Sequence, residues 1–208
     1  MRRTDPVLER MRIVAASMTG RRWTGPDAEQ QRLAAALVQR AGLEHGVAAV
    51  LAHRGVPPEA AEAYLTPSLR DLLPDPSVLK DMDAASLRIA HALQRRERIA
   101  VFADYDVDGG SSAALLITWL RQMGHGATLY VPDRIDEGYG PNEAAMAGLA
   151  QSHDLIICVD CGTLSHGPIA AAKGADVIVL DHHLAEAELP DCVAVVNPNR
   201  QDEDGTLG

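Results

Sequence analysis

Carboxylates and imidazoles gather in three short segments in the second half of the chain. The set is Asp104, Asp106, Asp108, Asp160, Asp181, His182 and His183. Carboxylates held close together repel one another, and some take up protons unless cations neutralise them. Mixed carboxylate and imidazole ligands suit Mn²⁺, with Mg²⁺ as an alternative, whereas zinc sites more often include cysteine. Two such ions about 3.5–4 Å apart would form a hydrolytic site for a phosphoryl group.

Each of these segments follows a short apolar run that is typical of a buried strand. The runs span residues 99–103, 127–131, 155–159, 177–180 and 193–196, and helices are expected over 111–123, 141–151 and 168–173. This alternation predicts an α/β fold, a mainly parallel sheet with helices on both faces. The carboxyl ends of parallel strands share one edge, where open α/β sheets bind ligands. We therefore expect the three segments to meet there.

Two glycines and two serines follow the first group of aspartates. Gly109, Gly110, Ser111 and Ser112 would open a helix and offer free backbone amides to a phosphate. Capping of the helix by serine alone explains the serines equally well. Arg134 lies in a glycine-rich loop after the second strand, where it could close over a substrate phosphate or belong to a plain surface turn.

Two other motifs overlap these residues. The aspartates of residues 104–109 match the start of an EF-hand loop, but the twelfth position is Leu115, which cannot supply the required carboxylate. Cys158 and Cys161 form a C-x-x-C without a second pair, and Cys158 lies inside an expected strand. This placement favours buried structural cysteines over a zinc or redox site.

The first half of the chain has helical periodicity and no catalytic constellation. We expect a helical N-terminal region over residues 1–77 and the α/β domain over residues 78–208. Residues 1–98 carry 15 Lys and Arg against 12 Asp and Glu, whereas residues 99–208 carry 4 against 17, a balance of −13. An acidic domain of this kind repels nucleic acid unless its carboxylates converge on cations.

The composition excludes several classes of protein. Hydrophobic residues make up 47% of the 208 residues and charged residues 23%, which excludes disorder of the whole chain. No stretch approaches the roughly 18 uninterrupted apolar residues of a membrane helix. The apolar patch at residues 11–18 makes a poor signal peptide. We therefore expect a cytoplasmic protein without membrane association. Residues 201–208 are polar, and we expect them to form a loop.

The acidic segments resemble the first three motifs of the DHH phosphoesterase superfamily. These motifs are Asp-Tyr-Asp-Val-Asp-Gly at 104–109, Val-Asp-Cys-Gly at 159–162 and Asp-His-His at 181–183. Within this superfamily, two further segments are similar to the RecJ family of single-strand-specific 5′→3′ DNA exonucleases. They are Arg134 with residues 137–140 (Glu-Gly-Tyr-Gly), and residues 197–199 (Asn-Pro-Asn). The similarity covers about residues 78–199.

The resemblance implies an activity and partners. The activity is Mn²⁺-dependent hydrolysis of phosphodiester bonds in single-stranded DNA, with release of 5′-mononucleotides, in DNA repair and recombination. A helicase or a single-strand-binding protein would be the partner. Two alternatives stay open: a DHH phosphoesterase for short oligonucleotides, dinucleotides or pyrophosphate, and a non-catalytic scaffold that binds nucleic acid or protein.

The resemblance also implies roles for the polar residues. The implied metal ligands are Asp106, Asp108, Asp160 and His182. Asp104 would be a further ligand or lie just behind the ligands, and His183 would face the scissile phosphate or complete a metal shell. Asp181 would orient the histidines, as carboxylates behind metal ligands do.

The chain departs from the family pattern at three places. Cys161 stands where the second motif usually carries Asn, and Gly110 with Ser111 replaces the more usual Ala-Thr. The family also has a fourth Asp, a C-terminal substrate-binding domain and an OB-fold further along. The chain therefore resembles the N-terminal part of a RecJ protein, and we expect this part alone to bind metal and DNA more weakly.

Overall fold

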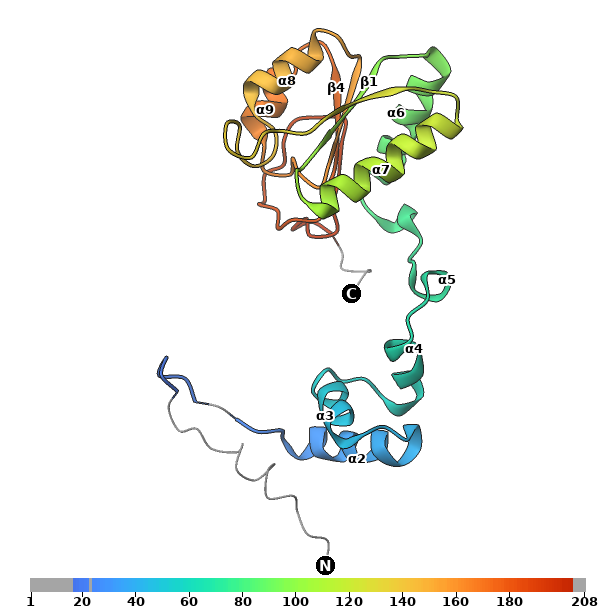
Figure 1. Ribbon diagram of the computed structural model, residues 1–208, viewed down its shortest axis with the longest axis vertical. Helices are drawn as coiled ribbons and strands as arrows, with labels where there is room; N and C mark the ends of the chain where they lie inside the picture. The colour runs from blue at the N-terminus through green and yellow to red at the C-terminus, as the bar shows by residue number, and fades with distance from the viewer. Residues whose placement is uncertain (1–16, 23, 204–208) are drawn as a thin grey trace, which may run out of the picture. The chain divides into compact units, whose positions relative to one another are not determined.

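The structure is a computed structural model that describes residues 17–22 and 24–203. Residues 1–16 of the expected helical region and the last five residues of the expected terminal loop lie outside this part. The chain divides into two compact units, Met1–Leu73 and Pro74–Gly208. Figure 1 shows both units. Among the described residues, no helix combines the length and apolar character that crossing a membrane requires.

In the described part of the first unit, helices and turns follow one another from Ala28 onward. Helix α2 (Ala28–Ala41) begins at Asp27, whose side chain accepts a hydrogen bond from the Gln30 amide, and ends at Gly42 in a left-handed conformation. Helix α3 (His45–His53) packs against α2, and both contribute to a small apolar core. The 3₁₀ turn η1 (Pro58–Ala60) and the short helices α4 (Ala61–Leu65) and α5 (Leu69–Leu72) follow.

The second unit is built on a five-stranded sheet in which every pair of neighbours is parallel. Its order is β2-β1-β3-β4-β5, with strands β1 (Ile99–Ala103), β2 (Ala127–Tyr130), β3 (Leu155–Val159), β4 (Asp176–Leu180) and β5 (Ala194–Val196). Ala103 pairs with Val159, and Leu180 pairs with both Val159 and Val196. Residues that follow these four strands therefore start level with one another along one edge.

Helices cover both faces of the sheet, as predicted. In Figure 1, α6 (Met82–Arg95) and α7 (Val107–Gln122) lie on one side, and α8 (Glu143–Ala150) and α9 (His166–Ala171) lie on the other. Alternate strand residues point to opposite faces. Val101 and Ile157 therefore pack in the core beneath α6 and α7, whereas Phe102 packs in the core beneath α8 and α9. The predicted α/β fold is confirmed.

The three helices predicted over 111–123, 141–151 and 168–173 differ in their bounds from the observed ones, and the second spans Glu143–Ala150. The helix after β1 begins at Val107 rather than Ser111, because Asp106 caps it: Oδ1 of Asp106 accepts hydrogen bonds from the amides of Asp108 (2.8 Å) and Gly109 (3.0 Å). The helix expected over 168–173 spans His166–Ala171. Pro168 lies within its first turn, where the missing amide hydrogen costs nothing, rather than at its first position.

Candidate metal centre

The polar residues singled out in the sequence meet at the carboxyl edge of the sheet. Asp104 directly follows β1, Asp160 follows β3, and residues 181–183 follow β4. From β1 the chain passes to β2 on one side and then to β3 on the other, so the strand order reverses between β1 and β3. Open α/β sheets bind ligands in the crevice at such a reversal. Asp104 and Asp160 lie on its two sides.

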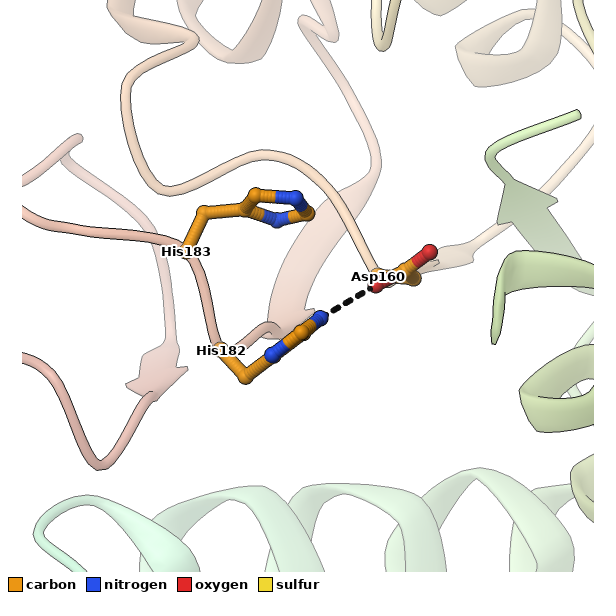
Figure 2. Close-up of side chains that lie close together, drawn as sticks. All are labelled: Asp160, His182 and His183. Atoms are coloured by element: carbon orange, nitrogen blue, oxygen red, sulfur yellow. Dashed lines mark ion pairs between the residues drawn. The ribbon is translucent and has the colours of Figure 1, made fainter. Parts of the chain in front are cut away.

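Two groups of donor atoms share Asp160. One consists of Asp104, Asp106 and Asp160, and the other of Asp160, His182 and His183; in each, the donor atoms lie within 4.8 Å of one another. Figure 2 shows the His182 ring directed at the Asp160 carboxylate, with Nε2 2.9 Å from Oδ1, and His183 on the same segment. We call these five residues the donor centre. A carboxylate common to both groups could serve two cations at once.

The buried carboxylates of the donor centre have few partners. Asp104 and Asp160 are 1% and 4% exposed; Oδ1 of Asp104 and Oδ2 of Asp160 have no hydrogen-bond partner among the described residues, and Oδ1 of Asp160 has only the ion pair with His182. Burial and the charge of Asp106 raise the pKa of Asp160, whereas the Gly109 amide lowers the pKa of Asp106. Such a cluster is unfavourable unless a cation neutralises it. Its oxygen and nitrogen donors fit Mn²⁺ or Mg²⁺.

The backbone holds Asp160 in an unusual conformation. Its φ is 62°, in the left-handed region, while its amide still donates to the Leu180 carbonyl at 2.8 Å. Aspartate is one of the few residues besides glycine that adopt this region with any frequency. Two residues later, Gly162 has a φ of 113°, and a Cβ there would come within 3.1 Å of the Val179 side chain. The turn after β3 is thus tightly packed, and strain of this kind clusters at functional sites.

Gly109 allows the start of α7 to approach the end of β1. A Cβ at this position would lie 2.3 Å from the carbonyl oxygen of Asp104. A Cβ on Gly110 would meet nothing within 4 Å. The close approach at Gly109 brings Asp106, which caps α7, next to Asp104 and Asp160.

The backbone amides of residues 109–112 are not free, so the prediction that they bind phosphate as open amides is wrong. The Gly109 amide donates to the Asp106 side chain, and the Gly110 amide donates to the Asp106 carbonyl at 2.9 Å. Ser111 and Ser112 lie inside α7, where amides bond to the preceding turn. Both serines line a cleft of about 510 Å³ beside the donor centre. A phosphate contact through their hydroxyls stays a prediction.

Asp108 belongs to neither donor group. It lies in the first turn of α7, is exposed, and lines the same cleft as Asp160 and His182. Its role as a metal ligand stays a prediction.

The Asp181 side chain contacts both histidines of the donor centre. Its Oδ1 accepts hydrogen bonds from the amides of His182 (2.7 Å) and His183 (3.2 Å) and lies 2.8 Å from Nδ1 of His183. Its Oδ2 accepts from the amide and hydroxyl of Thr163. Burial opposes the charge on Asp181, but the bonds from Thr163 and His183 outweigh it and lower its pKa. The bond to Asp181 in turn raises the pKa of His183.

A carboxylate only accepts hydrogen bonds, so Nδ1 of His183 carries the hydrogen in this arrangement and Nε2 is the nitrogen that faces away from Asp181. Both Asp181 oxygens already accept hydrogen bonds from the protein. The geometry therefore suits the orienting role expected for Asp181 rather than that of a ligand.

Tyr139 also lies at the donor centre, although the sequence suggested no role for it. Its hydroxyl lies 3.3 Å from both ring nitrogens of His183 and donates weakly to the Asp160 carbonyl at 3.4 Å. Burial raises the pKa of Tyr139, so the phenol keeps its proton. The flanking glycines, Gly138 and Gly140, both with positive φ, were the sequence signal for this turn.

The loop that carries Tyr139 is held by Glu137. This carboxylate accepts hydrogen bonds from the Tyr130 hydroxyl (2.5 Å), the Asp133 amide (2.8 Å) and the Asn142 side chain (3.1 Å). Arg134 is exposed on the same loop, with its guanidinium 5.4 Å from the centroid of the Tyr105 ring. This places Arg134 beside the donor centre, and its contact with phosphate stays a prediction.

Comparison with known proteins identifies the family. A model described as the N-terminal domain of the DHH family matches residues 98–208. The chain belongs to the DHH family. This DHH chain is 37% identical over 158 residues to the single-stranded-DNA-specific exonuclease RecJ of Bacillus subtilis, covering 74% of this chain and 20% of the relative. It is 40% identical over 128 residues to the RecJ of Salmonella typhimurium, covering 60% and 22%.

Solved structures resemble the DHH chain as well. A crystal structure of exonuclease RecJ bound to manganese is 33% identical, with a TM-score of 0.55 over 60% of this chain and 33% of that one. RecJ of Thermus thermophilus in complex with Mn²⁺ is 28% identical, with a TM-score of 0.62 over 88% and 25%. The DHH chain thus spans about a fifth of the length of the curated relatives named here.

Proposed function

We propose that this chain provides the metal-binding part of a nuclease that hydrolyses single-stranded DNA from the 5′ end and releases 5′-mononucleotides with Mn²⁺. The observation that carries the proposal is the pair of donor groups that share Asp160 at the reversal of strand order. The relatives named single-stranded-DNA-specific exonucleases support the substrate, and the manganese in the similar crystal structures supports the cation. The polarity rests on the resemblance to RecJ.

The chain's own residues would divide the work in a simple way. Asp104, Asp106 and Asp160 would hold one divalent cation, and Asp160 with the two histidines would hold a second or contact the phosphate. When bound, the cations supply Lewis acidity for the attack of water on phosphorus. Asp181 keeps Nε2 of His183 turned away from its own carboxylate. The protonated hydroxyl of Tyr139 is placed to donate a hydrogen bond beside that ring.

The charge of the domain favours a cation as its first ligand. Residues 99–208 carry 17 acidic against 4 basic side chains, and the donor centre brings together three carboxylates, of which Asp104 and Asp160 are buried. Cation binding removes repulsion within the donor centre and reduces the barrier to a polyanionic strand. We therefore expect single-stranded DNA to bind more tightly when Mn²⁺ is present than when it is absent.

The test compares Mn²⁺ binding and hydrolysis in the wild type, Asp106→Ala and the control Asp83→Asn. Asp83 is an exposed aspartate in the first turn of α6, outside the donor centre. Calorimetric titration with Mn²⁺ should show binding in the wild type and in Asp83→Asn, and none in Asp106→Ala. With 5′-labelled single-stranded DNA, mononucleotide release should follow the same pattern.

Three results would contradict the proposal. Absence of Mn²⁺ binding in the wild type would favour the scaffold alternative. Cleavage of dinucleotides or pyrophosphate without cleavage of longer DNA would favour the small-substrate alternative. Wild-type activity in Asp106→Ala would remove the donor centre from the reaction altogether.

A helicase or single-strand-binding partner, a role in repair and recombination, and a cytoplasmic location stay predictions.

A further inference from the structure

We propose that Asn197 and Thr163 are positioning residues that set the ring of His183 through a directed chain of hydrogen bonds ending at its Nδ1. The metal readout of this inference rests on the proposed function, whereas the hydrogen-bond chain can be tested without any metal.

The chain of bonds has one direction. Nδ2 of Asn197 donates to Oγ1 of Thr163 at 2.8 Å, and Oγ1 of Thr163 donates to Oδ2 of Asp181 at 2.7 Å. The other oxygen of Asp181 lies 2.8 Å from Nδ1 of His183. The Asp181 carboxylate has no hydrogen to give, so the Thr163 hydroxyl must point toward it and accept from Asn197. The same logic places the hydrogen of His183 on Nδ1.

Asn197 has no freedom to reverse this direction. Its side chain is fully buried, and Nδ2 also donates to the His183 carbonyl at 2.9 Å, while Oδ1 accepts from the Asn199 amide at 2.8 Å. If the Asn197 amide were flipped, its Oδ1 would face the His183 carbonyl oxygen, and two acceptors would meet without a hydrogen between them. Thr163 is equally enclosed, with 1% of its surface exposed. Buried polar networks in which every member is satisfied specify one arrangement.

The segment after β5 anchors the network from its far end. Asn199 Nδ2 donates to the His182 carbonyl, so both histidine carbonyls are held by this segment. Arg200, whose side chain is 8% exposed, donates to the Val195 carbonyl and to Asp81 at the start of α6, both at 2.7 Å. The position of His183 thus depends on residues that belong to neither donor group.

The experiment uses the Thr163→Val and Thr163→Ser variants. Valine keeps the shape of threonine but has no hydroxyl, whereas serine keeps the hydroxyl. Thr128→Val is the matched control. Thr128 lies on the edge strand β2, away from the donor centre, and its Oγ1 also lies close to a histidine ring, 2.9 Å from Nε2 of His153. Ring ¹⁵N–¹H correlation spectra of the metal-free protein at about pH 9, above the ordinary histidine pKa of about 6.5, report each tautomer. The His183 signal is assigned by its loss in His183→Gln.

We expect His183 to occupy the Nδ1–H tautomer in the wild type, Thr163→Ser and Thr128→Val. In Thr163→Val this signal should move toward a mixture of both tautomers. Mn²⁺ affinity should fall by about 10-fold or more in Thr163→Val and recover in Thr163→Ser, in line with other residues that orient metal ligands.

Clear outcomes would overturn the inference. One is an Nε2–H tautomer of His183 in the wild type, and another is an unchanged Nδ1–H signal in folded Thr163→Val. Thr163→Ala carries the same test if Thr163→Val does not fold. If the wild type binds no Mn²⁺, the proposed function fails, and the tautomer spectra alone decide the role of Thr163 and Asn197.

Discussion

Replacing Gly109 with alanine tests how closely α7 must approach β1. The added Cβ would lie 2.3 Å from the Asp104 carbonyl oxygen and 2.8 Å from both the carbonyl carbon and the nitrogen of that residue. All three are backbone atoms at the end of a buried strand, so they cannot move aside as a flexible side chain could. The first turn of α7 must shift instead, and Asp106 moves with it.

The two effects of this substitution oppose each other. Overpacking in a well-packed region costs about 1–3 kcal/mol, and a backbone clash belongs at or above the upper end. The higher helix propensity of alanine raises the free energy of unfolding by at most about 1 kcal/mol. We therefore expect Gly109→Ala to lower the free energy of unfolding by about 2 kcal/mol or more.

The neighbouring glycine provides the control. A Cβ on Gly110 meets nothing within 4 Å, and this residue also lies in α7. Gly110→Ala should therefore raise the free energy of unfolding by about 0.4–1 kcal/mol, because only the chain entropy changes. The two substitutions differ by one position and should have opposite signs.

Urea denaturation followed by circular dichroism measures both variants, with the midpoint shifting and the slope unchanged. Mn²⁺ titration should show weaker binding in Gly109→Ala and wild-type binding in Gly110→Ala. Equal stability of the two variants, or stabilisation by both, would refute the close approach at Gly109 and with it the assigned start of α7.

Other substitutions and conditions have defined outcomes. Asp160→Asn should raise the melting temperature of the metal-free protein, because removing the buried charge and its repulsion with Asp106 outweighs the loss of the ion pair with the exposed His182, and should abolish Mn²⁺ binding in calorimetry. Arg200→Leu should lower the free energy of unfolding by about 1–3 kcal/mol in urea denaturation, because the Arg200 guanidinium, 8% exposed, loses its hydrogen bonds to the Asp81 carboxylate, 39% exposed, and to the Val195 carbonyl; an unchanged midpoint would contradict this. Arg98 lowers the pKa of Asp154 to about 2, below the ordinary value of about 3.9. The stability from this pair is therefore present above about pH 4 and lost as the pH falls toward 2. Urea midpoints of the wild type and Asp154→Asn should accordingly converge over that range, and a constant difference would argue against the shift.

Much of the fold was predictable because it depends on local patterns. The apolar runs and the intervening helical periodicity located all five strands and the helices on both faces, since parallel strands buried on both sides are almost continuously apolar. Cys158 lies inside β3 as expected, and it is buried. Strand order was not predictable, because it depends on which strands pair over long distances.

The donor centre was also predictable only in part. That Asp104, Asp160 and the two histidines share an edge follows from their positions after strands. The start of α7 was missed because the helix was expected to begin at Ser111, just after the two glycines, whereas Gly109 already lies in the helix and allows a close contact with a residue that precedes it. Tyr139 was missed because its neighbours belong to other strands and become visible only when the sheet is assembled.

The left-handed backbone at position 160 narrows what this site can become. Glycine and asparagine tolerate such a backbone, but glycine offers no donor atom and asparagine no negative charge. Glutamate offers the charge but strains the backbone and overfills a space in which the native residue is only 4% exposed. The left-handed backbone and the need for a charged oxygen ligand together favour aspartate over these three residues, so we expect each of these exchanges at position 160 to weaken the proposed metal binding.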